Sequence, residues 1–134
     1  MKPAAVATLA ACALLAAVRH ADAACPPSSA AGALLSHGAV QLAWRAEPPV
    51  LQVGQPFALH VTLCPPQARL LRVDARMPEH RHGMNYRPTL THQGGGQWQA
   101  QGLLWHMSGR WELSLEVQTA EGGVQRLVQS VTLP

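Results

Sequence analysis

The chain has 134 residues, of which 48% are hydrophobic and 13% are charged, and its formal net charge at pH 7 is +3. This length suits a single domain and leaves no room for a second one after a leader is removed. The cationic residues are scattered and form no basic stripe interleaved with aromatic side chains. We therefore exclude nucleic acid as an expected partner.

Residues 1–23 have the features of a Sec signal peptide. Lys2 supplies a short positive region, residues 4–18 form an apolar stretch, and residues 21–23 (Ala-Asp-Ala) fit a small-x-small cleavage site. The apolar stretch is too short and too rich in alanine for a membrane span. We expect a periplasmic or secreted monomer without a membrane span in the mature chain. Lipidation at Cys12, which ends a lipobox-like sequence, is the less favoured alternative because cleavage there leaves a short apolar region.

Two cysteines remain after the leader is removed, Cys25 and Cys64, and each is followed by two prolines. An exported domain with two cysteines usually pairs them, so we predict a disulfide that ties the mature N-terminus to the end of a strand. Two free thiols, or a thiol pair in metal or redox chemistry, are the alternatives. The spacing differs from a C-x-x-C motif.

After an irregular lead-in over residues 24–37, the domain at residues 38–134 alternates apolar and polar side chains with period two. This alternation predicts strands that each bury one face. In chain order the inward-facing sets are Val40, Leu42 and Trp44; Phe57, Leu59, Val61 and Leu63; Leu71, Val73, Ala75 and Met77; Trp98, Ala100 and Leu104; and Trp111, Leu113, Leu115 and Val117. A last strand over residues 124–133 loses the pattern near Leu127 and Val128, which indicates a bulge or an edge strand.

Turn residues such as those at 94–96 and 121–123 separate these segments, and no segment has a helical period of useful length. Six to seven short antiparallel strands with one apolar face each predict an all-β fold. We expect an immunoglobulin-like antiparallel β-sandwich, in which the two sheets bury each other's apolar faces.

Histidines and methionines are concentrated at the end of the third expected strand. His80, His82 and Met84 follow one another at alternate positions, and His106 and Met107 come about twenty residues later, where a returning hairpin would reach the same end of the sandwich. On an extended backbone the first three share a face, and Gly83 would permit a bend or bulge that brings them closer together. Imidazole and thioether groups are ligands that copper accepts.

These five residues, His80, His82, Met84, His106 and Met107, are our candidate metal ligands, and copper(I) is the favoured ion. Zinc is less favoured because it prefers nitrogen, thiolate or carboxylate ligands. Affinity should fall at acidic pH, since only neutral imidazole binds a metal. Other roles stay open. Met107 would also pack well against a neighbouring tryptophan, and Met77 lies on the inward face of its strand and is expected in the core.

We expect no enzyme activity. The sequence contains no Gly-x-Ser-x-Gly motif, no phosphate-binding loop and no evident pair of catalytic carboxylates.

Two segments carry a resemblance to a known family. The sequence MPEHRHGM at residues 77–84 and the sequence WHMSGRW at residues 105–111 resemble the exported YtkA-like domain family, which is related to FixH-like domains. The resemblance covers roughly Val40 to Leu133 and implies a small extracytoplasmic immunoglobulin-like fold. It also implies a loose link with copper handling and respiratory oxidase assembly. Unlike FixH-like members, this chain has no obvious membrane helix after the leader.

Two hypotheses about function follow. In the first, the exported domain binds copper through the His/Met cluster and stores it or delivers it to a protein partner such as an oxidase under assembly. In the second, the domain is a non-catalytic interaction module that docks a partner protein through the same residues. Only the first requires stoichiometric binding that is lost when His80 and His82 are replaced.

Overall fold

A computed structural model describes residues 25–134. The expected signal peptide and the alternative lipidation site at Cys12 lie outside the described residues.

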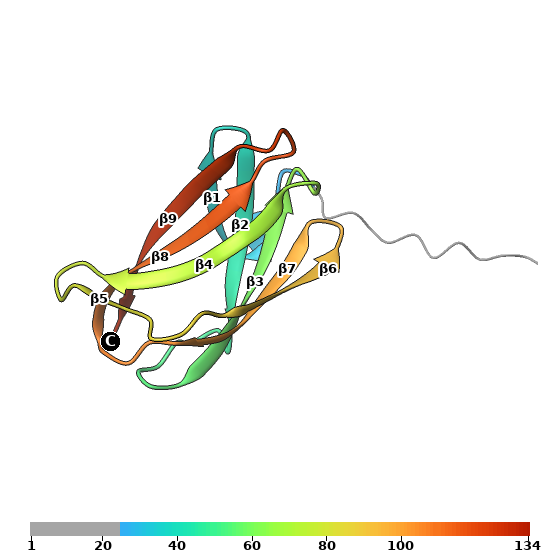
Figure 1. Ribbon diagram of the computed structural model, residues 1–134. Coiled ribbons are helices and arrows are strands. Elements are labelled where there is room, and N and C mark those ends of the chain that lie inside the picture. The colour runs from blue at the N-terminus through green and yellow to red at the C-terminus, as the bar shows by residue number, and fades with distance from the viewer. Residues whose placement is uncertain (1–24) are drawn as a thin grey trace, which may run out of the picture.

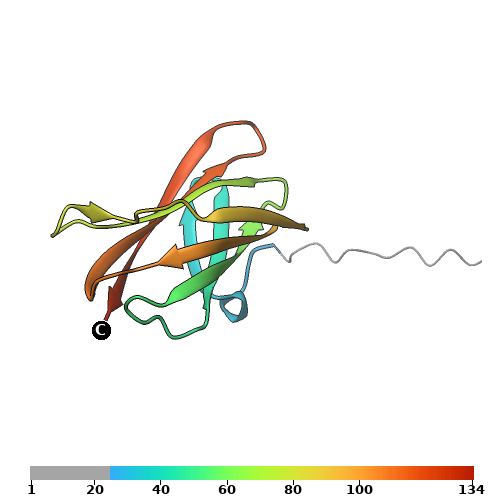
Figure 2. The ribbon, with the colours of Figure 1, turned by 60° about the horizontal axis from the view of Figure 1, so that its bottom comes forward.

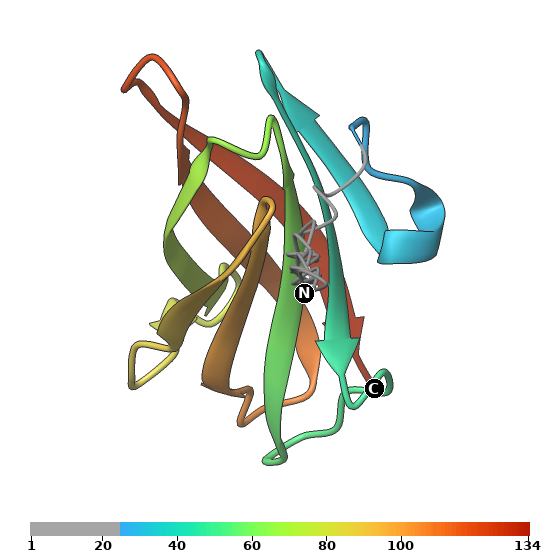
Figure 3. The same ribbon diagram turned by 90° about the vertical axis from the view of Figure 1, so that its right-hand side faces the viewer.

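Two antiparallel sheets pack face to face, as Figures 1 and 3 show. The five-stranded sheet has the order β1-β2-β3-β7-β6, and the four-stranded sheet has the order β5-β4-β8-β9. The strands are β1 (Ala33–His37), β2 (Val40–Glu47), β3 (Pro56–Cys64), β4 (Arg69–Met77), β5 (His82–Gly83), β6 (Thr89–Gly94), β7 (Gln97–Leu104), β8 (Gly109–Gln118) and β9 (Val124–Leu133), preceded by the short 3-10 helix η1 (Ser29–Ala31).

The strand order confirms the predicted immunoglobulin-like sandwich. Without the short strands β1 and β5, the first sheet reads β2-β3-β7-β6 and the second reads β4-β8-β9. This is the arrangement of strands ABED and CFG in the immunoglobulin fold. Residues 25–134 form nine strands rather than six or seven, and the additional strands β1 and β5 contain 5 and 2 residues. β5 is too short for a period-two pattern to identify, and β1 (Ala-Leu-Leu-Ser-His) does not alternate apolar and polar side chains.

The core lies between the two sheets, and its members come from the alternate positions that the sequence indicated. Every residue that the period-two pattern assigned to the core of β2, β3 and β8 is buried. The largest fully buried side chains include Trp105, Trp111, Leu42, Leu59, Leu63, Met77, Leu103, Leu113 and Leu115. Burial of this apolar surface is the main favourable contribution to the stability of the domain.

Two positions of the predicted core are wrong, and each error has a bulge as its cause. Leu71 is 43% exposed, and Leu70 is buried in its place, because the pairing of β4 with β8 shifts register between Leu70 and Arg72. Leu104 is only half-buried, and Leu103 is buried, because β7 has one extra residue opposite β3 near Gly102. Gly102 has φ 87°, a left-handed conformation that glycine adopts without strain.

The lead-in is less irregular than expected. Residues 33–37 form strand β1, which pairs in register with β2, so only residues 25–32 lie outside the sheets. The uneven pattern of the last strand reflects its position, since β9 is an edge strand with continuous pairing to β8 and no bulge. The structure contains the predicted disulfide between Cys25 and Cys64, whose Cα atoms are 5.6 Å apart. Within residues 25–134, no helix has the length and apolar character needed to cross a membrane.

Candidate metal centre

All five candidate ligands lie at one end of the sandwich. The hairpin between β4 and β5 carries His80, His82 and Met84, and the loop between β7 and β8 carries His106 and Met107. Figure 2 shows the hairpin and this loop on the same side of the molecule, opposite the end at which residue 25 enters. We call the hairpin segment 77–84 together with the loop segment 105–108 the His/Met end. The expectation that a returning hairpin brings the two clusters to one end is confirmed.

The hairpin turn follows from its sequence. Pro78 sits at the second position of a turn that the backbone amide of His80 closes by donating to the carbonyl of Met77, at 3.2 Å. Proline favours this position because its φ is preset near −65°. The chain then reverses at Arg81, whose φ of 53° makes it the non-glycine residue with positive φ among those described. The bend expected at Gly83 is therefore at Arg81, and Gly83 continues in strand β5.

The register of the hairpin decides which of its side chains face the five-stranded sheet. His82 pairs directly with Met77, and Gly83 pairs with Arg76. Directly opposed residues of an antiparallel pair point to the same face, so His82 takes the inward face that Met77 occupies. The backbone amide of Met84 donates to the carbonyl of Ala75, at 3.2 Å, which extends this alignment by one position. Because β5 is the edge strand of its sheet, His82 is inward-facing and still exposed.

The three imidazoles form a small group of rings. The ring centroids of His80 and His82 lie 6.2 Å apart, with planes only 17° from parallel. Those of His82 and His106 lie 6.1 Å apart, with planes inclined by 73°. The ring of His82 therefore lies near both His80 on the hairpin and His106 on the loop, and all three rings are exposed to solvent.

Both candidate thioethers lie between this surface and the core. Met84 and Met107 are half-buried and pack against the core cluster. Met77 is 1% exposed, so the expectation that it belongs to the core is confirmed. Gly109 has a φ of 118°, which residues with a side chain rarely adopt, and a Cβ atom there would also lie 2.9 Å from the terminal methyl group of Met77, so both features favour glycine at the start of β8.

The loop from Trp105 to Ser108 is held from two directions. The backbone amide of Gly54, in the β2–β3 loop, donates to the carbonyl of Trp105 at 2.8 Å. The indole Nε1 of Trp111 donates to the carbonyl of Met107 at 3.0 Å. The alternative that Met107 packs beside a tryptophan is compatible with this arrangement, since Trp111 lies directly below the loop. Sequence reasoning placed Trp111 in the core and gave it no part in the site.

Charged side chains brace the outer face of the same end. Arg110 donates to Glu79 at 2.7 Å and to Glu112 at 3.3 Å, and Arg76 donates to Glu112 at 2.9 Å. The pKa of Glu79 is lowered below its ordinary value of 4.5 by two hydrogen bonds, first one with the backbone of Glu79 itself and then one from the side chain of Arg110. Hydrogen bonds from Arg76 and Arg110 lower the pKa of Glu112 in the same way. This network links the turn that carries His80 to the start of β8.

Within residues 25–134, no three histidine, cysteine, aspartate or glutamate side chains form a ready set of metal ligands. The structure brings the three imidazoles near one another, and both methionines are half-buried against the core at the same end. A metal ion here would have to draw the rings inward and take sulfur as a further ligand.

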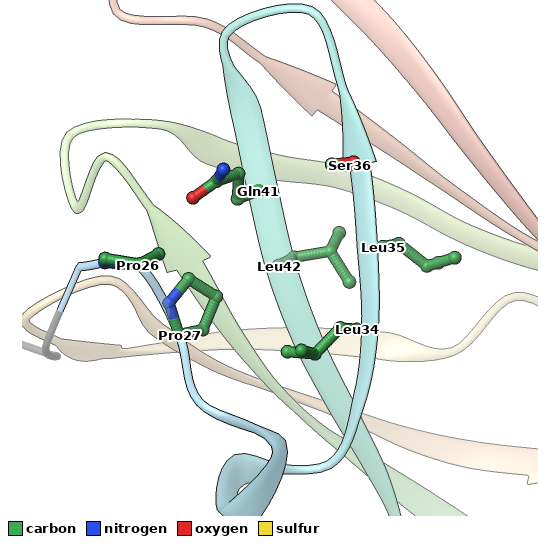
Figure 4. A pocket seen from close by; sticks show the side chains of 7 residues that line it. All are labelled: Pro26, Pro27, Leu34, Leu35, Ser36, Gln41 and Leu42. Atoms are coloured by element: carbon green, nitrogen blue, oxygen red, sulfur yellow. The ribbon is translucent and has the colours of Figure 1, made fainter.

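The larger surface hollows lie elsewhere. One of about 300 Å³ is bounded by Pro26 and Pro27 on one side and by Leu34 and Leu42 on the other, as Figure 4 shows. Another of about 500 Å³ lies between β2, the β2–β3 loop and β9. Neither hollow is lined by a histidine or an acidic residue among those described.

None of the family models, curated proteins or solved structures compared with this chain matches it.

Proposed function

We propose that this protein is an exported copper-binding module in which the His/Met end holds one copper(I) ion. The observation that carries the proposal is the spacing of the three imidazoles. An imidazole nitrogen about 2.0–2.1 Å from a metal ion puts its ring centre roughly 3 Å from that ion, so two rings on one ion lie roughly 5–6.5 Å apart. The His80–His82 and His82–His106 separations of 6.2 and 6.1 Å fall within this range.

The choice of copper(I) rests on the thioethers. Met84 and Met107 lie half-buried at the same end, and thioether sulfur is a soft ligand that suits copper(I) and contributes little to zinc. A disulfide between Cys25 and Cys64 leaves no thiolate among the described residues to compete for the ion. Methionine also keeps its metal-binding group in an oxidising compartment, where paired cysteines lose theirs.

The resemblance to the YtkA-like family and the features of residues 1–23 favour an exported protein that handles copper, either storing it or passing it to a partner in oxidase assembly. The disulfide is compatible with an extracytoplasmic location.

A competition titration tests the proposal. The full chain is expressed with export, and the mature protein is titrated with copper(I) in the presence of a chromophoric chelator. We expect one ion per chain for the wild type and loss of binding for the His80→Ala/His82→Ala variant. The matched control is His37→Ala/His92→Ala, because His37 ends β1 and His92 stacks on Trp98, both away from the five candidate ligands. Equal affinity of wild type and the first variant would refute the site.

Docking of a partner protein is the second candidate function, and the exposure of the hairpin tip favours it. His80, Arg81 and His82 are all exposed, and Figure 2 shows the hairpin projecting from the body of the sandwich. Arg81 adopts the left-handed conformation that costs a non-glycine residue energy, which is common at functional positions. Under this function, the loss of the two histidines would weaken partner binding in the absence of copper.

A further inference from the structure

We infer that Trp111 is a positioning residue for the copper site, because it fixes the loop that presents His106 and Met107. The inference rests on the proposed function and adds a residue that the ligand pattern does not contain. Trp111 would not touch the metal ion. It would act through the two ligands of the β7–β8 loop.

Trp111 is itself held rigidly. Its side chain is fully buried, and its ring stacks on Trp105 with centroids 5.2 Å apart and planes 7° from parallel. Trp105 in turn meets Phe57 edge-on at 5.2 Å. Aromatic pairs at these separations contribute beyond the area they bury, so the indole has a single well-defined orientation.

Two contacts join this fixed ring to the loop. The indole N–H donates to the carbonyl of Met107 at 3.0 Å. The same ring meets the imidazole of His106 edge-on, with centroids 5.6 Å apart and planes inclined by 79°. Both candidate ligands of the loop therefore take their placement from one side chain, and His106 is held toward His82 at 6.1 Å.

Two tryptophans of this core donate their indole N–H: Trp44 to the side chain of Gln129 at 2.7 Å, and Trp111 to the backbone of the β7–β8 loop. The buried indole nitrogens of Trp98 and Trp105 have no hydrogen-bond partner among the described residues. Burial of an indole N–H without a partner costs free energy. Packing of the ring, rather than a hydrogen bond, therefore accounts for tryptophan at these two positions. At Trp111 the N–H is used, and its acceptor is the backbone of a candidate ligand.

A loop that is ordered before the ion arrives loses less conformational entropy on binding. Replacement of a group that orients metal ligands without touching the metal typically lowers the affinity for the metal by ten- to a hundredfold. We therefore expect Trp111→Phe, which keeps an aromatic ring and removes the N–H donor, to weaken copper(I) binding by roughly ten- to a hundredfold.

The matched control is Trp98→Phe, which removes an indole N–H that has no partner and leaves the loop unchanged. Affinities are measured by chelator competition on mature protein, at a temperature at which circular dichroism shows each variant folded. We expect the control to bind within about twofold of the wild type, as for sites that do not interact. Equal losses in the two variants would overturn the inference.

A second comparison separates positioning from a general structural effect. In a His106→Ala/Met107→Leu background, Trp111→Phe should lower the remaining affinity by no more than about twofold, because the ligands through which it acts are gone. The full ten- to a hundredfold loss in that background would show a structural effect and refute positioning.

If Trp111→Phe does not fold, the wild-type protein supplies the test. The indole ¹⁵N–¹H resonance of Trp111 should shift on addition of copper(I), and that of Trp98 should not. An unchanged Trp111 resonance with copper bound would overturn the inference and leave the proposed function intact. Failure of the wild type to bind copper(I) would instead defeat the proposed function.

Discussion

The two ends of the sandwich are held together by different means. At one end, a covalent bond between Cys25 and Cys64 fixes the lead-in to the last residue of β3. At the other, the β4–β5 hairpin and the β7–β8 loop depend on single hydrogen bonds, stacked rings and exposed ion pairs. Figure 2 shows the two ends on opposite sides of the molecule.

The disulfide end therefore contributes to stability, whereas the candidate ligands lie at the His/Met end. The disulfide end has prolines and apolar side chains around its hollow, with no charged side chain in the lining, and it restricts the chain without offering ligands. The His/Met end exposes three imidazoles that are close together, and it is held by hydrogen bonds, ring contacts and exposed ion pairs rather than by a covalent bond. Under the proposed function, an end that is held by noncovalent contacts can open locally to accept an ion and release it, as delivery to a partner requires.

The largest effect on stability should come from the core beneath the His/Met end. Trp111→Ala removes a fully buried ring that stacks on Trp105, and large-to-small changes of this kind cost about 3–5 kcal/mol. Urea denaturation followed by circular dichroism measures the loss. A cost below about 1 kcal/mol, the range of surface substitutions, would contradict the assignment of Trp111 to the core.

Removal of the Cys25–Cys64 disulfide should lower the free energy of unfolding somewhat less than Trp111→Ala does. The Cys25→Ser/Cys64→Ser variant should lower the free energy of unfolding by about 2–4 kcal/mol, mainly because the unfolded chain regains freedom. Copper(I) affinity should stay at the wild-type value, since the disulfide lies at the opposite end. A large loss of affinity in folded protein would show that the two ends are coupled and would break the comparison. Thiol labelling of unreduced, denatured wild type should find no free cysteine.

The stability of the domain should be sensitive to a methyl group added at Gly109, where the β7–β8 loop ends. Gly109→Ala combines a φ of 118° with a clash against Met77, and we expect a loss of about 1–3 kcal/mol in the free energy of unfolding. Gly122→Ala is the matched control, because Gly122 has a φ of 95° with open space around it. The difference between the two variants measures the Met77 contact. If the two losses are equal, backbone strain alone explains the glycine.

The smallest effect should come from the ion pair that braces the hairpin. A lowered pKa means that ionised Glu79 stabilises the folded state above pH 4.5 and that this contribution disappears as the pH falls below that value. Wild type should therefore unfold at a slightly higher urea concentration than Glu79→Gln at pH 7, and this difference should shrink as the pH falls below 4.5. Glu121→Gln, in an exposed turn outside the ion pairs of the described residues, is the control. A difference that persists at low pH would contradict the assignment.

The sequence predicted the sandwich because strict alternation fixes one buried face in each long strand. Trp111, Leu113 and Leu115 alternate without interruption, and all three are buried. The pattern failed at Leu71 and at Leu104, where a bulge inserts residues and inverts the faces. Bulges depend on the partner strand, and a single strand's pattern contains no signal for them except a glycine such as Gly102.

The grouping of the candidate ligands at one end was predictable from the turn spacing, whereas their bracing was not. Pro78 signals the hairpin turn, but nothing local indicates that Arg81 takes a left-handed backbone or that Arg110 bonds Glu79 across 31 positions of sequence. The contact between Trp111 and Met107 was equally hidden, because a tryptophan on a buried face is interpreted as core before its N–H is considered. Such contacts depend on tertiary structure rather than on local sequence.

Nuclear magnetic resonance of the histidine rings tests the central claim most directly. Mature wild-type protein with ¹⁵N-labelled histidine is titrated with one equivalent of copper(I), and the imidazole resonances are followed. We predict that His80, His82 and His106 shift together and saturate at one equivalent, and that His37, His60 and His92, which lie outside the His/Met end, stay in place. Shifts at the second group, or no shift at the first group with copper bound, would contradict a copper site at the His/Met end.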